Sequence, residues 1–103
     1  MIITTTEMVP GREYDILGLV EGGTIQTVHL GKDLGASLKT LVGGELKGYN
    51  EMMQKARRIA TERMEEEAAR IGADAVVCMR YSSSSVMQNA SEVMAYGTAV
   101  RFR

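Results

Sequence analysis

The chain has 103 residues, a length typical of one domain, which we expect to span residues 1–103. Its 12 basic and 13 acidic residues give a formal net charge of −1, which argues against a nucleic-acid binder, since that class needs a basic surface. No apolar run approaches the roughly 20 residues that cross a bilayer, and the N-terminus lacks the pattern of a signal peptide. With a single cysteine and no internal disulfide, these features predict a cytoplasmic protein without a membrane segment.

The first third of the chain is β-prone. "MIITT" at residues 1–5 predicts a short strand, and "MVPG" at 8–11 predicts a turn. Two further β-like stretches, 14–20 and 24–30, are separated by "EGG", which predicts a hairpin or a sharply bent strand. Leucines at helical spacing then predict a short helix at about 33–42.

The segment from about 45 to 71 carries the clearest helical pattern. Its apolar residues recur at steps of three and four, as one face of a helix requires. Gly72 follows as a left-handed C-terminal cap. Residues 73–81 then predict a strand, 82–91 a serine-rich hairpin loop, and 92–103 a final strand with alternating side chains.

The long helix predicts self-association. At 1.5 Å per residue, it would measure about 40 Å, whereas a compact domain of this size has a radius of gyration near 13 Å. Its apolar positions occupy an arc of roughly 180°, wider than the ~100° that one packing surface uses. We therefore expect part of this helix to contact a second copy of the chain.

Three stretches also carry a resemblance to a known family: "VGGELKGYNEMMQKARRIATERM", "EEEAARIGADAVV" and the closing "YGTAV". Together they resemble the YbjQ-like family of small prokaryotic proteins, which bears the label "putative heavy-metal-binding". The resemblance implies an α+β, dodecin-like β-α-β-β unit, with an antiparallel sheet on one long helix and extra short strands. It also implies a ring of identical subunits, a pentamer, and no established activity.

The stretch "LVGGELKGY" at 41–49 raises the question of a phosphate-binding loop. Gly43 and Gly48 have the P-loop separation, but Tyr49 and Asn50 stand where that motif has lysine and a hydroxyl residue. Glu45 would also place a carboxylate in the first helical turn, where it disfavours an anion. We therefore interpret Gly43 and Gly44 as the joint between two helices.

A soft-metal site would need thiolate, imidazole or thioether ligands. Cys78 and His29 are the candidate metal ligands, together with methionines, because the chain has one cysteine and one histidine. A buried structural thiol and a surface histidine are the competing interpretations. One cysteine and one histidine cannot close a four-ligand site without carboxylates, thioethers or symmetry copies.

The helix also carries candidate interface residues, whose roles we expect to be structural: Tyr49, Met53, Arg57, Arg63, Glu67 and Arg70. Arg57 lies at the edge of the apolar arc without a carboxylate three or four residues away, so Glu92, a neighbouring subunit or a ligand anion is its expected partner. Glu67 projects into the arc between Arg63 and Arg70, which predicts an interface ion-pair network.

No arrangement of nucleophile and base is evident, so we expect a protein without catalytic activity. The serine run at 82–85 has no activating base near it in the sequence. The leading hypothesis is a self-assembling protein that binds any ligand at its subunit junctions. Soft-metal binding through Cys78 and His29 is one alternative, and a dodecin-like carrier of a small cofactor, which itself remains unidentified, is another.

Overall fold

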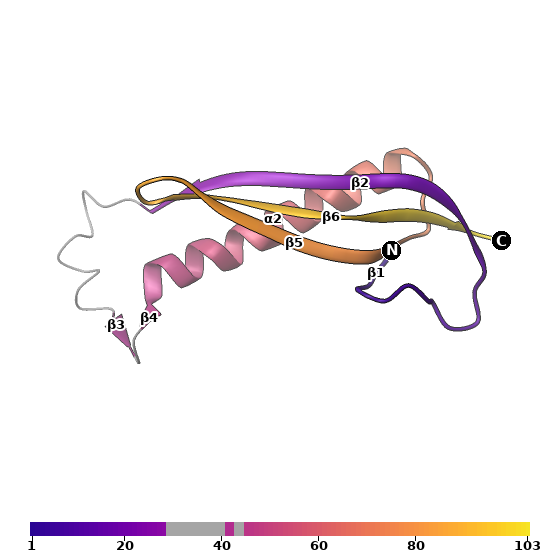
Figure 1. Ribbon diagram of the computed structural model, residues 1–103, viewed down its shortest axis with the longest axis horizontal. Helices are drawn as coiled ribbons and strands as arrows, with labels where there is room; N and C mark the ends of the chain where they lie inside the picture. Colours follow the sequence, from indigo (N-terminus) through magenta and orange to yellow (C-terminus); the bar gives the residue numbers. More distant parts are fainter. Residues whose placement is uncertain (29–40, 43–44) are drawn as a thin grey trace.

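The computed structural model describes residues 1–28, 41–42 and 45–103. It confirms the predicted α+β class, because a four-stranded sheet packs against one long helix (Figure 1). The elements in chain order are β1 (Ile2–Ile3), β2 (Tyr14–Thr27), β3 (Leu41–Val42), β4 (Glu45–Leu46), α2 (Lys47–Arg70), β5 (Ala75–Met87) and β6 (Ala90–Phe102). Within the described ranges, no helix has the length and apolar content that crossing a bilayer requires.

The main sheet has the strand order β1-β5-β6-β2. β6 pairs antiparallel with both β2 and β5, whereas β1 runs parallel to β5. The long strands β2, β6 and β5 therefore form the expected antiparallel sheet, and the short β1 adds a parallel strand at one edge, so the sheet as a whole is mixed. β2 forms the opposite edge.

β2 is one continuous strand, so the predicted hairpin at "EGG" is wrong. Its pairing with β6 runs without a shift from Gly18, opposite Ala99, to Thr27, opposite Ala90. A Cβ atom on Gly22 would overlap the backbone of Ala60 and Met64 in α2. Glycine is therefore needed at position 22 because the helix backbone lies directly on the strand, not because the chain turns.

The serine-rich segment is strand and not the predicted loop. β5 continues to Met87, with Ser82 opposite Met94 and Ser84 opposite Glu92 in β6. Only Gln88 and Asn89 form the turn, and Asn89 has a φ of 65°, a conformation that asparagine tolerates. Serine is a poor strand former, so pairing with the longer β6 overrides its local preference here.

The predicted long helix is confirmed, from Lys47 to Arg70. Glu45 lies before it in β4, so the carboxylate predicted for its first turn is not there. The glycine cap is confirmed: Gly72 has a φ of 82°, and its N–H donates to the carbonyl of Ala69 at 3.1 Å. The guanidinium of Arg101 donates to the carbonyls of Ile71 and Gly72, which places a cation at the negative end of the helix.

The predicted short helix at about 33–42 is wrong at its end, because Leu41 and Val42 pair antiparallel with Leu46 and Glu45. Residues 33–40 lie outside the described residues, as do Gly43 and Gly44. The two segments flanking the glycine pair are short strands, so the interpretation of that pair as a joint between two helices is also wrong.

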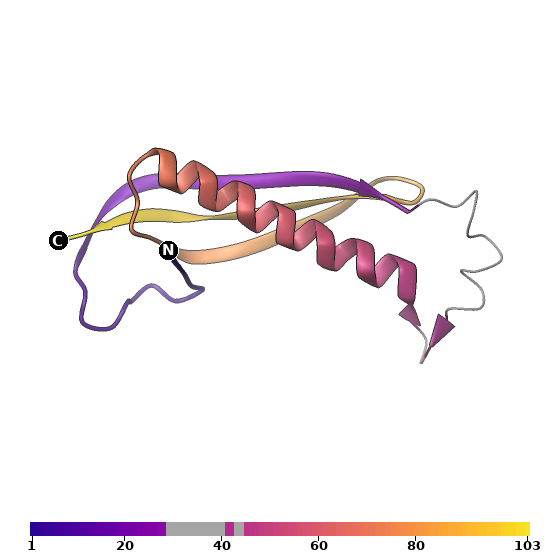
Figure 2. The same cartoon turned by 180° about the vertical axis from the view of Figure 1, so that it is seen from behind.

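The core lies between α2 and the sheet. The buried residues of α2 recur every four positions: Met52, Ala56, Ala60, Met64 and Ala68. Each step of four advances about 40° around the helix, so this stripe winds, and α2 runs diagonally across the sheet (Figure 2). The alanines bring the helix close to the buried strand residues Val20, Val93, Ala95 and Ala99. The N-terminal end of α2 diverges from the tip of the β5–β6 hairpin.

The molecule is elongated. Its radius of gyration is 17.0 Å and its principal extents are 55 × 25 × 17 Å. A compact domain of this length has a radius of gyration of about 13 Å. The excess reflects the main sheet and α2, which both extend far along one axis and leave much side-chain surface uncovered.

Candidate functional site

Cys78 lies at a bulge in β5, where the register with β6 shifts between Val77 and Arg80. Its φ is 55°, and its N–H donates to the carbonyl of Thr6 at 3.0 Å. The side chain is half-buried against an apolar cluster that contains Val9, Ala75, Val77, Val100, Tyr14 and Phe102. This surrounding resembles that of a structural thiol more than that of a metal ligand.

The described residues hold no group of three or more His, Cys, Asp and Glu side chains that could bind a metal ion. His29, the other candidate ligand, lies outside the described residues. The described part of one chain thus supplies a single thiol, which does not fit a closed metal site without ligands from elsewhere.

Arg63 and Glu67 contact the backbone of β2, one on each side of Gly22. The Arg63 guanidinium donates to the carbonyl of Gly23 at 2.8 Å, and a Glu67 carboxylate oxygen accepts from the N–H of Glu21 at 3.0 Å. No ion pair joins Arg63, Glu67 and Arg70 in the described part of the chain. Arg70 is exposed in the last turn. Within one chain, two of these three residues therefore fasten the helix to an edge strand.

Tyr49, Met53 and Arg57 are all half-buried on α2. Met53 packs on the margin of the core. The expected pairing of Arg57 with Glu92 is not formed, because Val93 and Ala95 face the helix and Glu92 therefore points to the other side of the sheet. The neighbouring-subunit and ligand-anion interpretations of Arg57 stay predictions.

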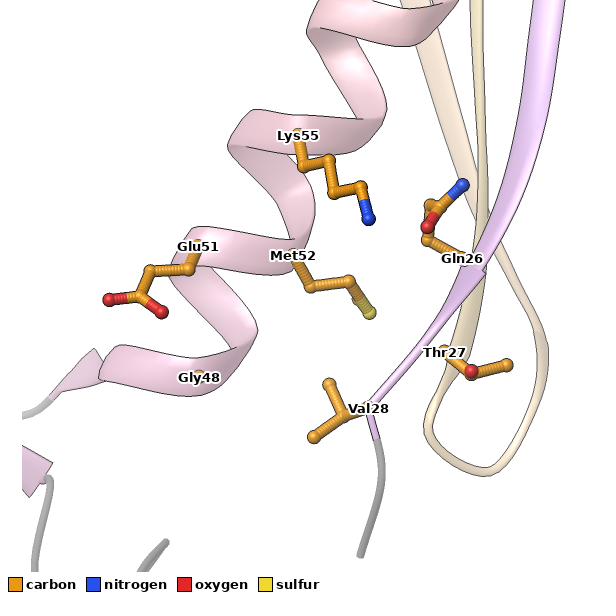
Figure 3. A pocket seen from close by; sticks show the side chains of 7 residues that line it. All are labelled: Gln26, Thr27, Val28, Gly48, Glu51, Met52 and Lys55. Atoms are coloured by element: carbon orange, nitrogen blue, oxygen red, sulfur yellow. The ribbon is translucent and has the colours of Figure 1, made fainter.

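A cavity of about 370 Å³ lies between the end of β2 and the N-terminal half of α2. Its lining comprises Gln26, Thr27, Val28, Gly48, Glu51, Met52 and Lys55. The Lys55 and Gln26 side chains point toward each other across it, while Glu51 points outward (Figure 3). The Gln26 amide donates to Thr24 at 2.8 Å, so one of its polar groups is already engaged.

The face of the sheet opposite α2 carries exposed apolar side chains. The N-terminal segment covers one end of this face, where Val9 packs on Ala75, Val77 and Val100. Further along, Leu19 is 68% exposed and Ile25 is 57% exposed. We call Leu19, Ile25, Met94 and Tyr96 the outer patch, because the alternation of β2 and β6 places all four side chains on this face.

The sequence interpretation missed the outer patch. Dividing 14–30 into two strands hid the fact that one strand carries two apolar sets, with Val20 toward the helix and Leu19 and Ile25 away from it. The signal that could have found the patch is the alternation through residues 19–25, where apolar residues fall on both faces of the strand.

A family model described as "Putative heavy-metal-binding", YbjQ_1, matches residues 1–103. A UPF0145 protein of Thermotoga maritima is 59% identical over 102 residues, which cover 98% of this chain and 96% of that protein. A UPF0145 protein of Vibrio campbellii is 54% identical over 102 residues, which cover 98% of each. A crystal structure of a protein of unknown function from Pediococcus pentosaceus, of the DUF74 family, matches with a TM-score of 0.66 at 18% identity, covering 100% of this chain and 98% of that one. The chain therefore belongs to the YbjQ-like family, whose described property is "Putative heavy-metal-binding".

Proposed function

We propose that this protein is a non-catalytic protein that assembles into a ring of identical subunits and binds any ligand at the junctions between them. The outer patch is the observation that carries the proposal. It places exposed leucine, isoleucine and tyrosine side chains on neighbouring strands, on a face of the sheet that neither the helix nor the N-terminal segment covers there. Such surfaces mark contacts with other molecules.

The shape of the chain supports the same proposal. A domain with a radius of gyration of 17.0 Å buries less of its surface than a compact one, and subunit contacts recover that burial. The half-buried Tyr49, Met53 and Arg57 belong to the N-terminal half of α2, so they offer a second flank for contact. A ring requires two different surfaces on each subunit, which the patch and such a flank would provide.

A native mass spectrum of the protein as purified, without added metal, tests this function. A mass of five subunits is expected, since the family resemblance implies a pentamer. A five-fold mass with a reproducible adduct would identify a junction ligand, and the same mass without one would direct the search to partner proteins. A monomer at every concentration would overturn the proposal.

Soft-metal binding is a second candidate, supported by the description of the family. Cys78 would supply the thiolate, with His29 and methionines as further ligands, and symmetry copies would have to complete the set. The Cys78→Ser variant should lose stoichiometric Cu(I) uptake if this function is real, while Met8→Leu, at an exposed methionine, serves as the control. Equal uptake by the parent and the Cys78→Ser variant would remove Cys78 as a ligand.

A dodecin-like cofactor carrier is the weaker alternative. A flat cofactor stacks most readily on aromatic side chains, and the described residues that line the cavity include none. An absorbance spectrum of the purified protein tests this alternative: a visible, flavin-like band would support a carrier, and a colourless protein would count against a tightly bound flavin.

A further inference from the structure

The two edges of the main sheet differ in how many of their outward backbone N–H and C=O groups are already hydrogen-bonded; we call an edge closed where these groups have partners. β2 forms one edge, and helix side chains occupy its outward backbone groups at Glu21 and Gly23. The strand itself also carries Asp15 and Glu21. Charged side chains on or over an edge are a common means of preventing another strand from pairing there.

The β5 edge is closed only along its first part. β1 pairs with Ala75 and Val76, and Thr4 and Thr6 continue the contact as far as Cys78 and Met79. The Arg80 guanidinium then donates to the carbonyl of Thr5. The N-terminal segment thus covers β5 up to Met79 and no further among the described residues.

Residues 81–87, which we call the open edge, differ from β2 in charge and in how far other side chains cover their backbone. Each of these residues is exposed, and none carries a charge. Apart from the bonds to β6, the backbone groups of this segment make one hydrogen bond among the described residues, in which the Ser85 hydroxyl donates to the Met87 carbonyl at 3.4 Å. Tyr81 and Val86 are each 47% exposed, and Met87 is 67% exposed, so apolar side chains flank the free backbone groups.

We propose that the open edge accepts a backbone segment of a second copy of this chain. This inference rests on the proposed function and names one of the two surfaces that a ring needs. A neutral edge places no like charges opposite an incoming strand, whereas the charged and capped edge of β2 opposes one. Pairing along one short strand buries less than the ~1,000 Å² that a specific contact needs, and Tyr81, Val86 and Met87 supply the additional apolar area.

A lysine at Ser84 tests the proposal. Ser84 lies in the middle of the open edge, opposite Glu92, so a lysine there is compatible with the folded subunit. The subunit concentration at which half of the protein is assembled should rise at least ~tenfold. This change corresponds to a loss of about 1.4 kcal/mol of binding free energy per contact. Ser84→Thr keeps the site neutral, and Gln54→Lys adds the same charge at an exposed helix position; both should assemble like the parent.

Amide hydrogen exchange of the unaltered protein provides a second measurement. The amide groups within 81–87 that face away from β6 should gain protection as rising concentration drives assembly. Assembly with these amides unprotected, or a Ser84→Lys variant that assembles like the parent, would overturn this inference and leave the proposed function intact. A protein that stays monomeric would overturn both, so the two failures are distinguishable.

Discussion

A carboxylate oxygen of Glu67 accepts a hydrogen bond from the backbone N–H of Glu21 at 3.0 Å, across 46 positions of sequence. Two residues away, Arg63 binds the Gly23 carbonyl from the same helix. The pair satisfies a donor and an acceptor on an edge strand that would otherwise face water or another chain. A residue pair predicted to link subunits therefore also closes an edge within one subunit.

Replacing Glu67 with alanine should lower the free energy of unfolding by about 1 kcal/mol, because a charge-assisted hydrogen bond at a solvated edge is lost. Chemical denaturation of the dissociated subunit measures the change. Glu66→Ala removes the same charge from an exposed neighbouring position and should stay within about 0.5 kcal/mol of the parent. Equal losses in the two variants would show that the contact contributes no stability.

Glu67→Lys is consequently a poor test of assembly. It removes a contact within the subunit, so a lower assembled mass would have two explanations. Met53→Glu has the same weakness to a smaller degree, since Met53 packs partly on the core.

Gly22→Ala should destabilise the subunit by about 3 kcal/mol, the range for forcing atoms into a packed core. The added methyl group would meet helix backbone, which cannot move away as a flexible side chain could. Thermal or chemical unfolding measures the loss. Gly48→Ala is the matched control, because its Cβ meets nothing within 4 Å in a helix and should add about 0.5–1 kcal/mol of stability. Similar effects of the two changes would show that α2 does not lie on β2 at Gly22.

The sequence was sufficient for the helix and its cap because both depend on local patterns. The apolar residues from 52 to 68 recur every four positions, and the glycine at 72 follows the last of them by four residues, so both signals can be seen in a short stretch of sequence. The continuity of β2 and the strand character of Ser82–Ser85 depend instead on pairing with β6, a contact across the chain. "EGG" and "SSSS" favour turns locally, and tertiary pairing overrides that preference.

In the candidate site, too, local features could be predicted from the sequence, whereas features that depend on tertiary contacts could not. The apolar surroundings of Cys78 could be expected from "VVCMR", whereas its bulge could not, because the bulge arises where Gly97 opposes two residues of β5. The different closure of the two sheet edges was also beyond sequence reasoning. It depends on two sets of tertiary contacts. Arg63 and Glu67 bond to the backbone of β2, and the backbone bonds of Thr4 and Thr6 to β5 extend only as far as Met79.

The Thr61 and Tyr81 hydroxyls join α2 to β5 at 2.7 Å. Thr61 donates its proton to the carbonyl of Arg57, so Tyr81 must be the donor to Thr61. A double-mutant cycle with Thr61→Val and Tyr81→Phe should give a coupling free energy of about 1 kcal/mol in chemical denaturation. Additive effects of the two changes would mean that the helix and β5 are not linked at this point.

Leu19→Glu should dissociate the assembly while leaving the subunit stable. Leu19 is 68% exposed and lies outside the core clusters, so its loss should change the free energy of unfolding by no more than about 0.5 kcal/mol. A charge that becomes buried without a partner in a subunit contact, by contrast, costs on the order of several kcal/mol. Sedimentation velocity and denaturation, measured on the same sample, separate the two effects. Gln54→Glu adds the same charge on the exposed side of α2 and should retain the parent mass. If Leu19→Glu kept that mass as well, the outer patch would not be a subunit contact, and the assembly surface would have to lie on the open edge and the helix flank alone.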